Sequence, residues 1–146
     1  MRTRHEAVIP AAPEAVFALA AAVESWTALH PAYRWCRVLE RAPDVTVFEM
    51  GGRIRGWPAR WMARQERFPR EGRIVFRHIA GLTRGMVVQW TLTPAAAGTR
   101  VVIDHDLTLP WPILGRAVAD LVVGPIFIDW IAARTLEGVR RVLEAR

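Results

Sequence analysis

The chain has 146 residues, which is typical of one domain with a hydrophobic core of its own. Its hydrophobic fraction of 52% is ordinary for a globular protein, and its single cysteine, Cys36, excludes an internal disulfide. The formal charge of +6 comes from arginines dispersed along the chain, whereas nucleic-acid-binding proteins tend to cluster theirs, so we expect no nucleic-acid partner. The N-terminus lacks the apolar core of a signal peptide, and no apolar stretch is long enough for an integral membrane segment, so we expect a cytoplasmic protein.

A short strand and two short helices open the chain. The strand candidate runs from Arg4 to Ile9 and ends at Pro10. A helix is predicted to begin at residues 12–14, because proline and an acidic residue both suit a first helical turn. A second helical turn begins at Glu24 and stops at His30-Pro31.

Six short segments of alternating apolar and polar residues follow, separated by turns rich in glycine and proline. The predicted strands are Tyr33–Arg41, Val45–Ile54, Trp57–Phe68, Arg73–Ile79, Met86–Thr93 and Arg100–Leu109. Their short connections predict an antiparallel meander. In the last strand, Val101, Ile103 and His105 face one way while Asp104 and Asp106 face the other. One face of the sheet is therefore apolar and needs a cover.

The last third of the chain, from Pro112 to Arg146, predicts one long helix. Steps of three and four residues place a mostly apolar set on one face: Leu114, Val118, Leu121, Pro125, Ile128, Ala132, Leu136, Val139 and Leu143. Proline inside the run at 125 predicts a kink. A second apolar stripe lies roughly opposite the first and comprises Ala119, Val123, Ile126, Phe127 and Trp130. It predicts either a covered second face, as in a homodimer contact or membrane-surface docking, or a shift of helical phase at Pro125.

This order of elements resembles the helix-grip fold of the START and Bet v 1-like superfamily, and most of all its bacterial polyketide cyclase/dehydrase and lipid-transport group. The resemblance covers essentially the whole chain and is carried by IPAAPEAVFALAAAVESWTALHPAY (9–33), GTRVVIDHDL (98–107) and RTLEGVRRVLE (134–144). It implies a single α+β domain over residues 1–146, in which a seven-stranded antiparallel sheet wraps around the long C-terminal helix, with two short helices after the first strand.

The aromatase/cyclase members of that group provide the nearest functional parallel. Trp26, Leu29 and Tyr33 match the spacing of a tryptophan, leucine and tyrosine on their second helix and second strand, and Trp61 resembles a tryptophan on their fourth strand. Their strand-four arginine, often assigned to binding or protonating substrate oxygens, corresponds to Gln65 here. The neighbouring Arg64 is expected on the opposite face, so this departure puts the cyclase chemistry in doubt.

We expect a mainly apolar cavity with a few polar anchors between the sheet and the long helix. Its predicted ligand-binding residues are Trp26, Tyr33, Trp61, Gln65, His78, Met86, Val88, Trp90, His105 and Ile128. The candidates for catalysis are Tyr33, His78 and His105; the alternatives are an ordinary strand tyrosine and two neutral core histidines. An inward Gln65 needs either a ligand or a neighbouring polar group, and Trp26 could instead be a structural plug. With one strand between them, the two histidines are predicted about 10–12 Å apart and to act independently.

No metal site or cofactor is expected, because the histidines lack ligand spacing and the chain has neither a glycine-rich phosphate loop nor a nucleophile elbow. The predicted partner is a hydrophobic or polyketide-like small molecule. The leading hypothesis is a polyketide cyclase/dehydrase-like protein, which would also imply an acyl carrier protein as partner. The rival hypotheses are a non-catalytic lipid or quinone carrier and a structural factor with a collapsed cavity.

Overall fold

The computed structural model describes residues 1–81, 83–108 and 115–146. Seven strands form one antiparallel sheet in the order β1-β7-β6-β5-β4-β3-β2. Their bounds are β1 (Arg2–Ile9), β2 (Tyr33–Ala42), β3 (Val45–Ile54), β4 (Trp57–Phe68), β5 (Arg73–Gly81), β6 (Val87–Ala95) and β7 (Gly98–Asp106). The predicted strands are confirmed to within two residues at the described ends, and Leu109, the predicted end of the last strand, lies outside the described residues. Strands β2 to β7 form the meander, and β1 closes against the last strand, β7.

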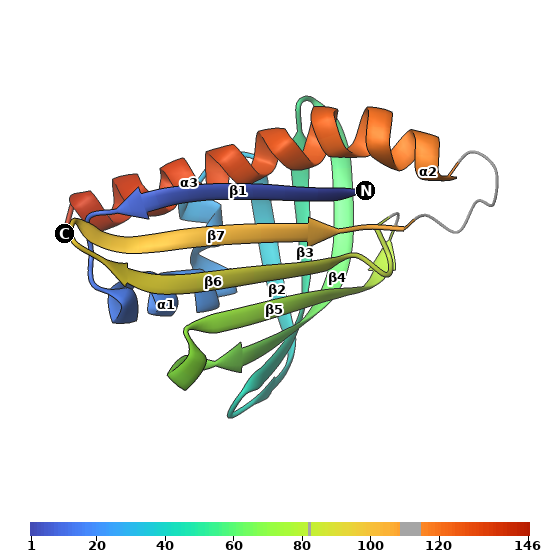
Figure 1. Ribbon diagram of the computed structural model, residues 1–146. Helices are drawn as coiled ribbons and strands as arrows, with labels where there is room; N and C mark the ends of the chain where they lie inside the picture. Colours follow the sequence, from blue (N-terminus) through green and yellow to red (C-terminus); the bar gives the residue numbers. More distant parts are fainter. Residues whose placement is uncertain (82, 109–114) are drawn as a thin grey trace.

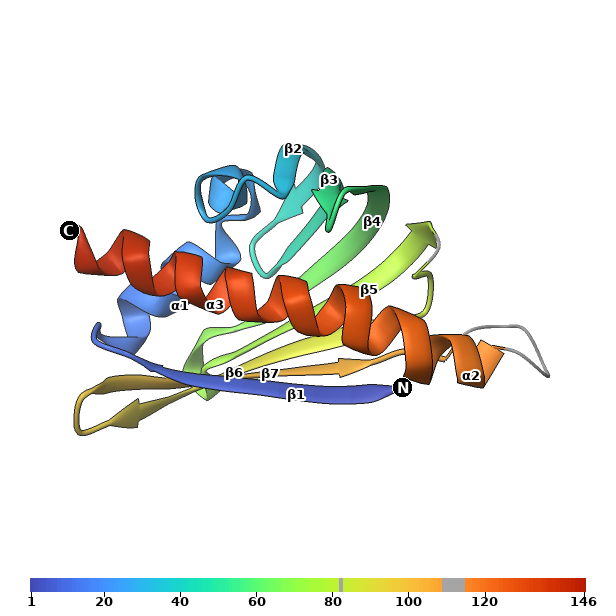
Figure 2. The same cartoon turned by 90° about the horizontal axis from the view of Figure 1, so that it is seen from above.

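Two short helices follow β1, as predicted: α1 (Pro13–Ala21) and the 3-10 helix η1 (Val23–Ala28). A further 3-10 turn, η2 (Pro69–Glu71), lies between β4 and β5. Pro13 opens α1 and Glu14 lies in its first turn, where the helix dipole favours an acidic side chain. Figure 2 shows α1 and the chain after it gathered near the C-terminal end of the long helix.

The C-terminal segment is one continuous helix that crosses the concave face of the sheet (Figures 1 and 2). It comprises α2 (Gly115–Val118), a π-helical stretch η3 (Ala119–Ile128) and α3 (Asp129–Glu144). The second half of the predicted buried face is confirmed, and these residues are Ile128, Ala132, Leu136, Val139 and Leu143. The predicted start of this helix, residues 112–114 including Leu114, lies outside the described residues.

The predicted buried face is wrong at Leu121 and Pro125, although Val118 before them packs against the hydrophobic core. Leu121 is 73% exposed and Pro125 is also exposed, whereas Ala119 and Val123 are buried. In η3 the N–H of Asp129 reaches back to the carbonyl of Gly124, a five-residue step that widens the turn around a proline with no N–H to donate. The helix therefore changes phase near Pro125, which is the predicted alternative to a covered second face, and Ala119 and Val123 of the second stripe pack inside this chain.

A close backbone contact fixes one end of α3 against the end of η1. A Cβ atom added to Gly138 would lie 2.2 Å from the carbonyl oxygen of Leu29, so only glycine allows this approach. Arg141 strengthens the same contact, because its Nη2 donates to the Leu29 oxygen at 2.8 Å. The long helix is thus held closely against η1 at this end, where α1 also lies (Figure 2), and we call it the closed end.

Candidate ligand-binding cavity

A cavity of about 330 Å³ lies between the concave face of the sheet and the helix η3–α3, a volume within the usual range of small-molecule sites. Nine of the ten predicted ligand-binding residues line it: Trp26, Tyr33, Trp61, His78, Met86, Val88, Trp90, His105 and Ile128. Lining residues that the sequence did not single out for the site include Phe48, Phe76, Thr83, Ile103, Val123, Phe127 and Thr135. The exposed lining residues Trp57, Pro58 and Arg60 all lie at the start of β4, so the mouth of the cavity is there.

Aromatic rings form the inner wall of the cavity. The Trp26 ring lies 5.3 Å from the Tyr33 ring, 5.5 Å from Phe76 and 5.8 Å from Trp90, measured between centroids. Its indole Nε1 donates to the carbonyl of Ala20 at 3.1 Å, which satisfies a donor that would otherwise be buried without a partner. Trp26 therefore lines the cavity and also fixes the helix–sheet junction, so both readings of this residue apply.

The Tyr33 hydroxyl is bonded to the scaffold. It lies 2.6 Å from Oγ1 of Thr135, which itself donates to the carbonyl of Ile131 at 2.7 Å. A threonine hydroxyl has one proton, so Tyr33 is the donor in the bond between them. Burial raises the pKa of Tyr33 above its ordinary value. At neutral pH this tyrosine is a neutral group whose proton is already engaged, which leaves its oxygen able only to accept a bond from a ligand.

His78 is a neutral imidazole held in place on both sides. Its Nδ1 lies 2.8 Å from the hydroxyl of Thr83, and its ring stacks on Trp61 with centroids 6.2 Å apart and planes 15° apart. Burial lowers the pKa of His78 to about 4, because the surroundings solvate the charged form poorly. Since Nδ1 is engaged by Thr83, Nε2 is the ring nitrogen left for a ligand.

His105 lies on the opposite side of β6, as predicted. Val88 on β6 pairs with His105 on β7, and the N–H of His78 donates to the carbonyl of Met86 just before β6. Burial first, and then the nearby His5 and His78, lower the pKa of His105 to about 3. Its Nδ1 is fully buried without a hydrogen-bond partner among the described residues, so Nε2 is the nitrogen that the cavity can reach. The two histidines thus present separate neutral groups to one space.

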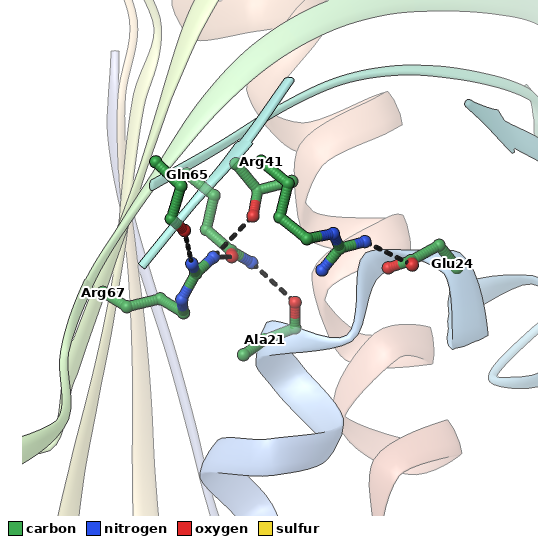
Figure 3. A network of polar contacts seen from close by, with 7 residues as sticks. Ala21, Glu24, Arg41, Gln65 and Arg67 are labelled. Atoms are coloured by element: carbon green, nitrogen blue, oxygen red, sulfur yellow. Dashed lines mark hydrogen bonds and ion pairs between the residues drawn. The ribbon is translucent and has the colours of Figure 1, made fainter. Parts of the chain in front are cut away.

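Gln65, which the sequence predicts as a cavity residue, does not line the cavity. Figure 3 shows its amide bonded to the scaffold: Nε2 donates to the carbonyl of Ala21 at 3.0 Å, and Oε1 accepts from Nη1 of Arg67 at 2.5 Å. Arg67 also donates to Oγ1 of Thr46 and to the carbonyls of Ala42 and Pro43. The alternative of a neighbouring polar group therefore holds for Gln65, and the two residues tie α1 to the sheet.

The sequence did contain a signal for Arg67. Arg67 has the same strand parity as Gln65 and Trp61, so the alternation along β4 indicates that its side chain lies on the inward face, at the end of the strand far from the cavity mouth. Arg64, expected on the outer face, is exposed and pairs with Glu66 at 3.4 Å.

Neither a metal centre nor a membrane span is present in the described part of the chain. Within residues 1–81, 83–108 and 115–146, no three His, Cys, Asp or Glu side chains are grouped as metal ligands would be. Among the same residues, no helix has both the length and the hydrophobicity that crossing a bilayer requires.

Comparison with known proteins agrees with this geometry. Residues 9–124 match the family model described as polyketide cyclase / dehydrase and lipid transport. The granaticin polyketide synthase bifunctional cyclase/dehydratase of Streptomyces violaceoruber is 31% identical over 111 residues, which are 74% of this chain and 34% of the relative. The chain thus spans about a third of that relative's length.

Solved structures share the complete fold. The Thermus thermophilus protein TTHA0849 is 27% identical, with a TM-score of 0.85 and 99% of both chains covered. The Zhui aromatase/cyclase from Streptomyces sp. R1128 is 20% identical, with a TM-score of 0.78 and coverage of 97% of this chain and 95% of that one; this second likeness concerns the fold alone. The chain belongs to the polyketide cyclase/dehydrase and lipid-transport family.

Proposed function

We propose that this protein binds an oxygenated, polyketide-like aromatic or pre-aromatic compound in the cavity and promotes its cyclisation or dehydration. The observation that carries the proposal is an aromatic-walled cavity into which two neutral imidazoles present a ring nitrogen. A purely hydrocarbon ligand would leave Nε2 of both imidazoles without a partner, at a cost in free energy. A ligand with carbonyl or hydroxyl oxygens would satisfy them.

The protonation state of the histidines indicates how they would act. With pKa values of about 4 and about 3, both are uncharged at neutral pH, so Nε2–H of each can donate a hydrogen bond to a carbonyl oxygen. A neutral imidazole in such a position polarises the carbonyl and stabilises the enolate that forms when the adjacent carbon gives its proton to Nε2 of His78, in the tautomer whose Nδ1–H donates to the Thr83 hydroxyl. That enolate is the nucleophile which closes a ring on a second carbonyl, and loss of water from the resulting alcohol gives the double bond.

A matched pair of ligands tests the recognition step. Anthraquinone and anthracene have the same fused rings, and only anthraquinone carries carbonyl oxygens. Quenching of the fluorescence of the cavity tryptophans would report both affinities. We expect wild-type protein to prefer anthraquinone at least about tenfold, since each hydrogen bond contributes roughly 1 kcal/mol, and a His78→Leu/His105→Leu double variant to lose the preference. Equal binding of the two compounds to wild-type protein would contradict the proposal. Turnover of a poly-β-ketone surrogate would then test catalysis.

A non-catalytic lipid or quinone carrier is the second candidate. It is favoured by Gln65, which occupies the position of the family arginine and is bonded to Ala21 and Arg67 away from the cavity. Native mass spectrometry of purified protein separates the two functions. A co-purifying lipid or quinone, together with no turnover of the surrogate, would favour the carrier. If the surrogate is turned over only when attached to an acyl carrier protein, that protein is the partner.

A further inference from the structure

Three buried polar atoms without hydrogen-bond partners lie in one place. In the described part of the chain these atoms are Oγ1 of Thr3, Nδ1 of His5 and Nδ1 of His105. Thr3 and His105 are direct partners across the β1–β7 ladder, and the rings of His5 and His105 have centroids 6.4 Å apart with planes at 85°. Buried polar atoms are rarely left unpaired, so the gathering of all three between two strands needs a reason.

The gathered atoms lie between the protein surface and the cavity. On the surface side, Nε2 of His5 is 3.1 Å from Oδ1 of Asp129, whose side chain is 45% exposed. On the inner side, His105 lines the cavity and presents Nε2 to it. Each histidine therefore has its Nδ1 buried within the cluster and its Nε2 directed away from it. Nε2 of His5 is directed toward Asp129, and Nε2 of His105 is directed toward the cavity.

The Thr3 hydroxyl has the chemistry to connect the two rings. A hydroxyl can accept one hydrogen bond while it donates another. Side chains directly opposite each other on antiparallel strands have Cβ atoms about 4.5–5.5 Å apart, and the connection requires Thr3 to adopt a χ1 rotamer that places Oγ1 between the two imidazoles. A chain of hydrogen bonds can thus run from the carboxylate of Asp129 through His5 and Thr3 to His105.

We propose that Asp129, His5, Thr3 and His105 form a proton relay that links the surface to the cavity. His105 is the group that touches the ligand, and the other three are positioning residues; only this ligand contact rests on the proposed function. When His5 carries protons on both nitrogens, its Nδ1 proton passes to the Thr3 oxygen, the Thr3 hydroxyl proton passes to Nδ1 of His105, and the Nε2 proton of His105 passes to a ligand oxygen. His5 is left neutral, with its Nε2 proton held by Asp129, and recovers the lost proton from solvent.

The relay accounts for how a histidine in so apolar a place could exchange protons. Direct protonation of His105 is opposed by its burial and by the neighbouring His5 and His78. In the relay His105 gains a proton at one nitrogen as it gives one up at the other, so no charged imidazole has to persist. After the transfer its Nε2 is free to accept a proton from a ligand carbon.

Imidazole ¹⁵N NMR of the ligand-free protein tests the relay without any activity measurement, so its failure is separate from failure of the proposed function. We expect Asp129→Asn to shift the His105 Nδ1 resonance, because the tautomer of His5 is no longer held by a carboxylate. The shift should be lost when Asp129→Asn is combined with Thr3→Val, which removes the connecting hydroxyl, and should return with Thr3→Ser.

Asp104→Asn is the matched control. Asp104 precedes His105 directly but pairs with Arg4 at 2.8 Å on the outer face of the sheet, so its loss should leave the His105 resonances unmoved. The relay is overturned if Asp129→Asn leaves His105 unmoved, if the response persists with Thr3→Val, or if Asp104→Asn produces a response of the same size.

Discussion

The two ends of the helix–sheet interface use buried polar groups in opposite ways. At the closed end, the side-chain donors and acceptors of Gln65 and Arg67 are bonded to Ala21, Thr46 and the chain at residues 42–43. At the cavity end, Nδ1 of His105 has no partner among the described residues and its Nε2 faces an apolar space. Bonded polar groups hold elements together, whereas polar groups directed at a cavity are available to a ligand, so substitutions at the two ends should have different effects.

The largest effect is expected from Gly138→Ala at the closed end. Alanine normally stabilises a helix interior by about 1 kcal/mol relative to glycine. Here the new methyl group would meet the Leu29 carbonyl at 2.2 Å, so we expect a net loss of about 3 kcal/mol in unfolding free energy. Denaturant unfolding measures it. Ala133→Gly, at an exposed position of the same helix, is the control for propensity, with an expected loss of about 1 kcal/mol. A stabilised Gly138→Ala variant would contradict the close contact.

The next largest effect is expected from Arg67→Met, which should lower the unfolding free energy by about 2 kcal/mol and leave the anthraquinone affinity unchanged. The variant keeps a long apolar side chain but leaves the amide oxygen of Gln65 and two backbone carbonyls without their donor. Arg64→Met on the outer face of the same strand is the control and should change stability by less than about 0.5 kcal/mol. A loss of anthraquinone affinity in Arg67→Met with an unchanged melting temperature would contradict the division between the two ends.

The buried His105 at the cavity end should make the stability of the protein depend on pH. The pKa of His105 is about 3 in the folded protein and near its ordinary value of 6.5 in the unfolded chain, so below pH 6.5 the unfolded state binds the extra proton. Stability from this group is complete above pH 6.5 and falls as the pH drops toward 3. Between pH 7 and pH 5 the loss should be about 2 kcal/mol. In a His105→Leu variant, the unfolding free energy measured by urea denaturation should depend correspondingly less on pH across this range. An unchanged pH dependence would contradict the buried neutral histidine.

Tyr33→Phe should give the smallest effect and tests the boundary between the two ends. The ring stays in the aromatic wall, and only the bond to Thr135 is lost, so we expect about 1 kcal/mol of destabilisation. Anthraquinone affinity should change less than twofold, because the hydroxyl proton is committed to the scaffold. Thermal unfolding and tryptophan quenching on the same samples measure both quantities. A large loss of affinity with an unchanged melting temperature would instead make Tyr33 a ligand anchor.

Local patterns were sufficient for most of the fold. Alternation along the strands and the turn residues between them predicted six strands of the meander, because side-chain direction in a strand depends only on parity. The same parity placed Trp61, Trp90 and His105 on the cavity face. In the helix, the three-and-four spacing held through α3 and failed at Leu121 and Pro125, because Pro125 lies in a π-helical stretch whose wider turn shifts the helical phase.

What each polar side chain bonds to was decided only by the tertiary structure. The sequence predicted that Gln65 points inward, but its choice of Ala21 and Arg67 over a ligand depends on how α1 docks against β4. The sequence likewise marked His105, but nothing in it brings Thr3 and His5 alongside, because β1 and β7 are separated in the chain by the other five strands and meet only when the sheet forms. Parity and propensity are properties of neighbours in sequence, whereas hydrogen-bond partners and cavities arise from contacts between distant segments. Those distant contacts decided which inward residues bond to the scaffold and which face the cavity.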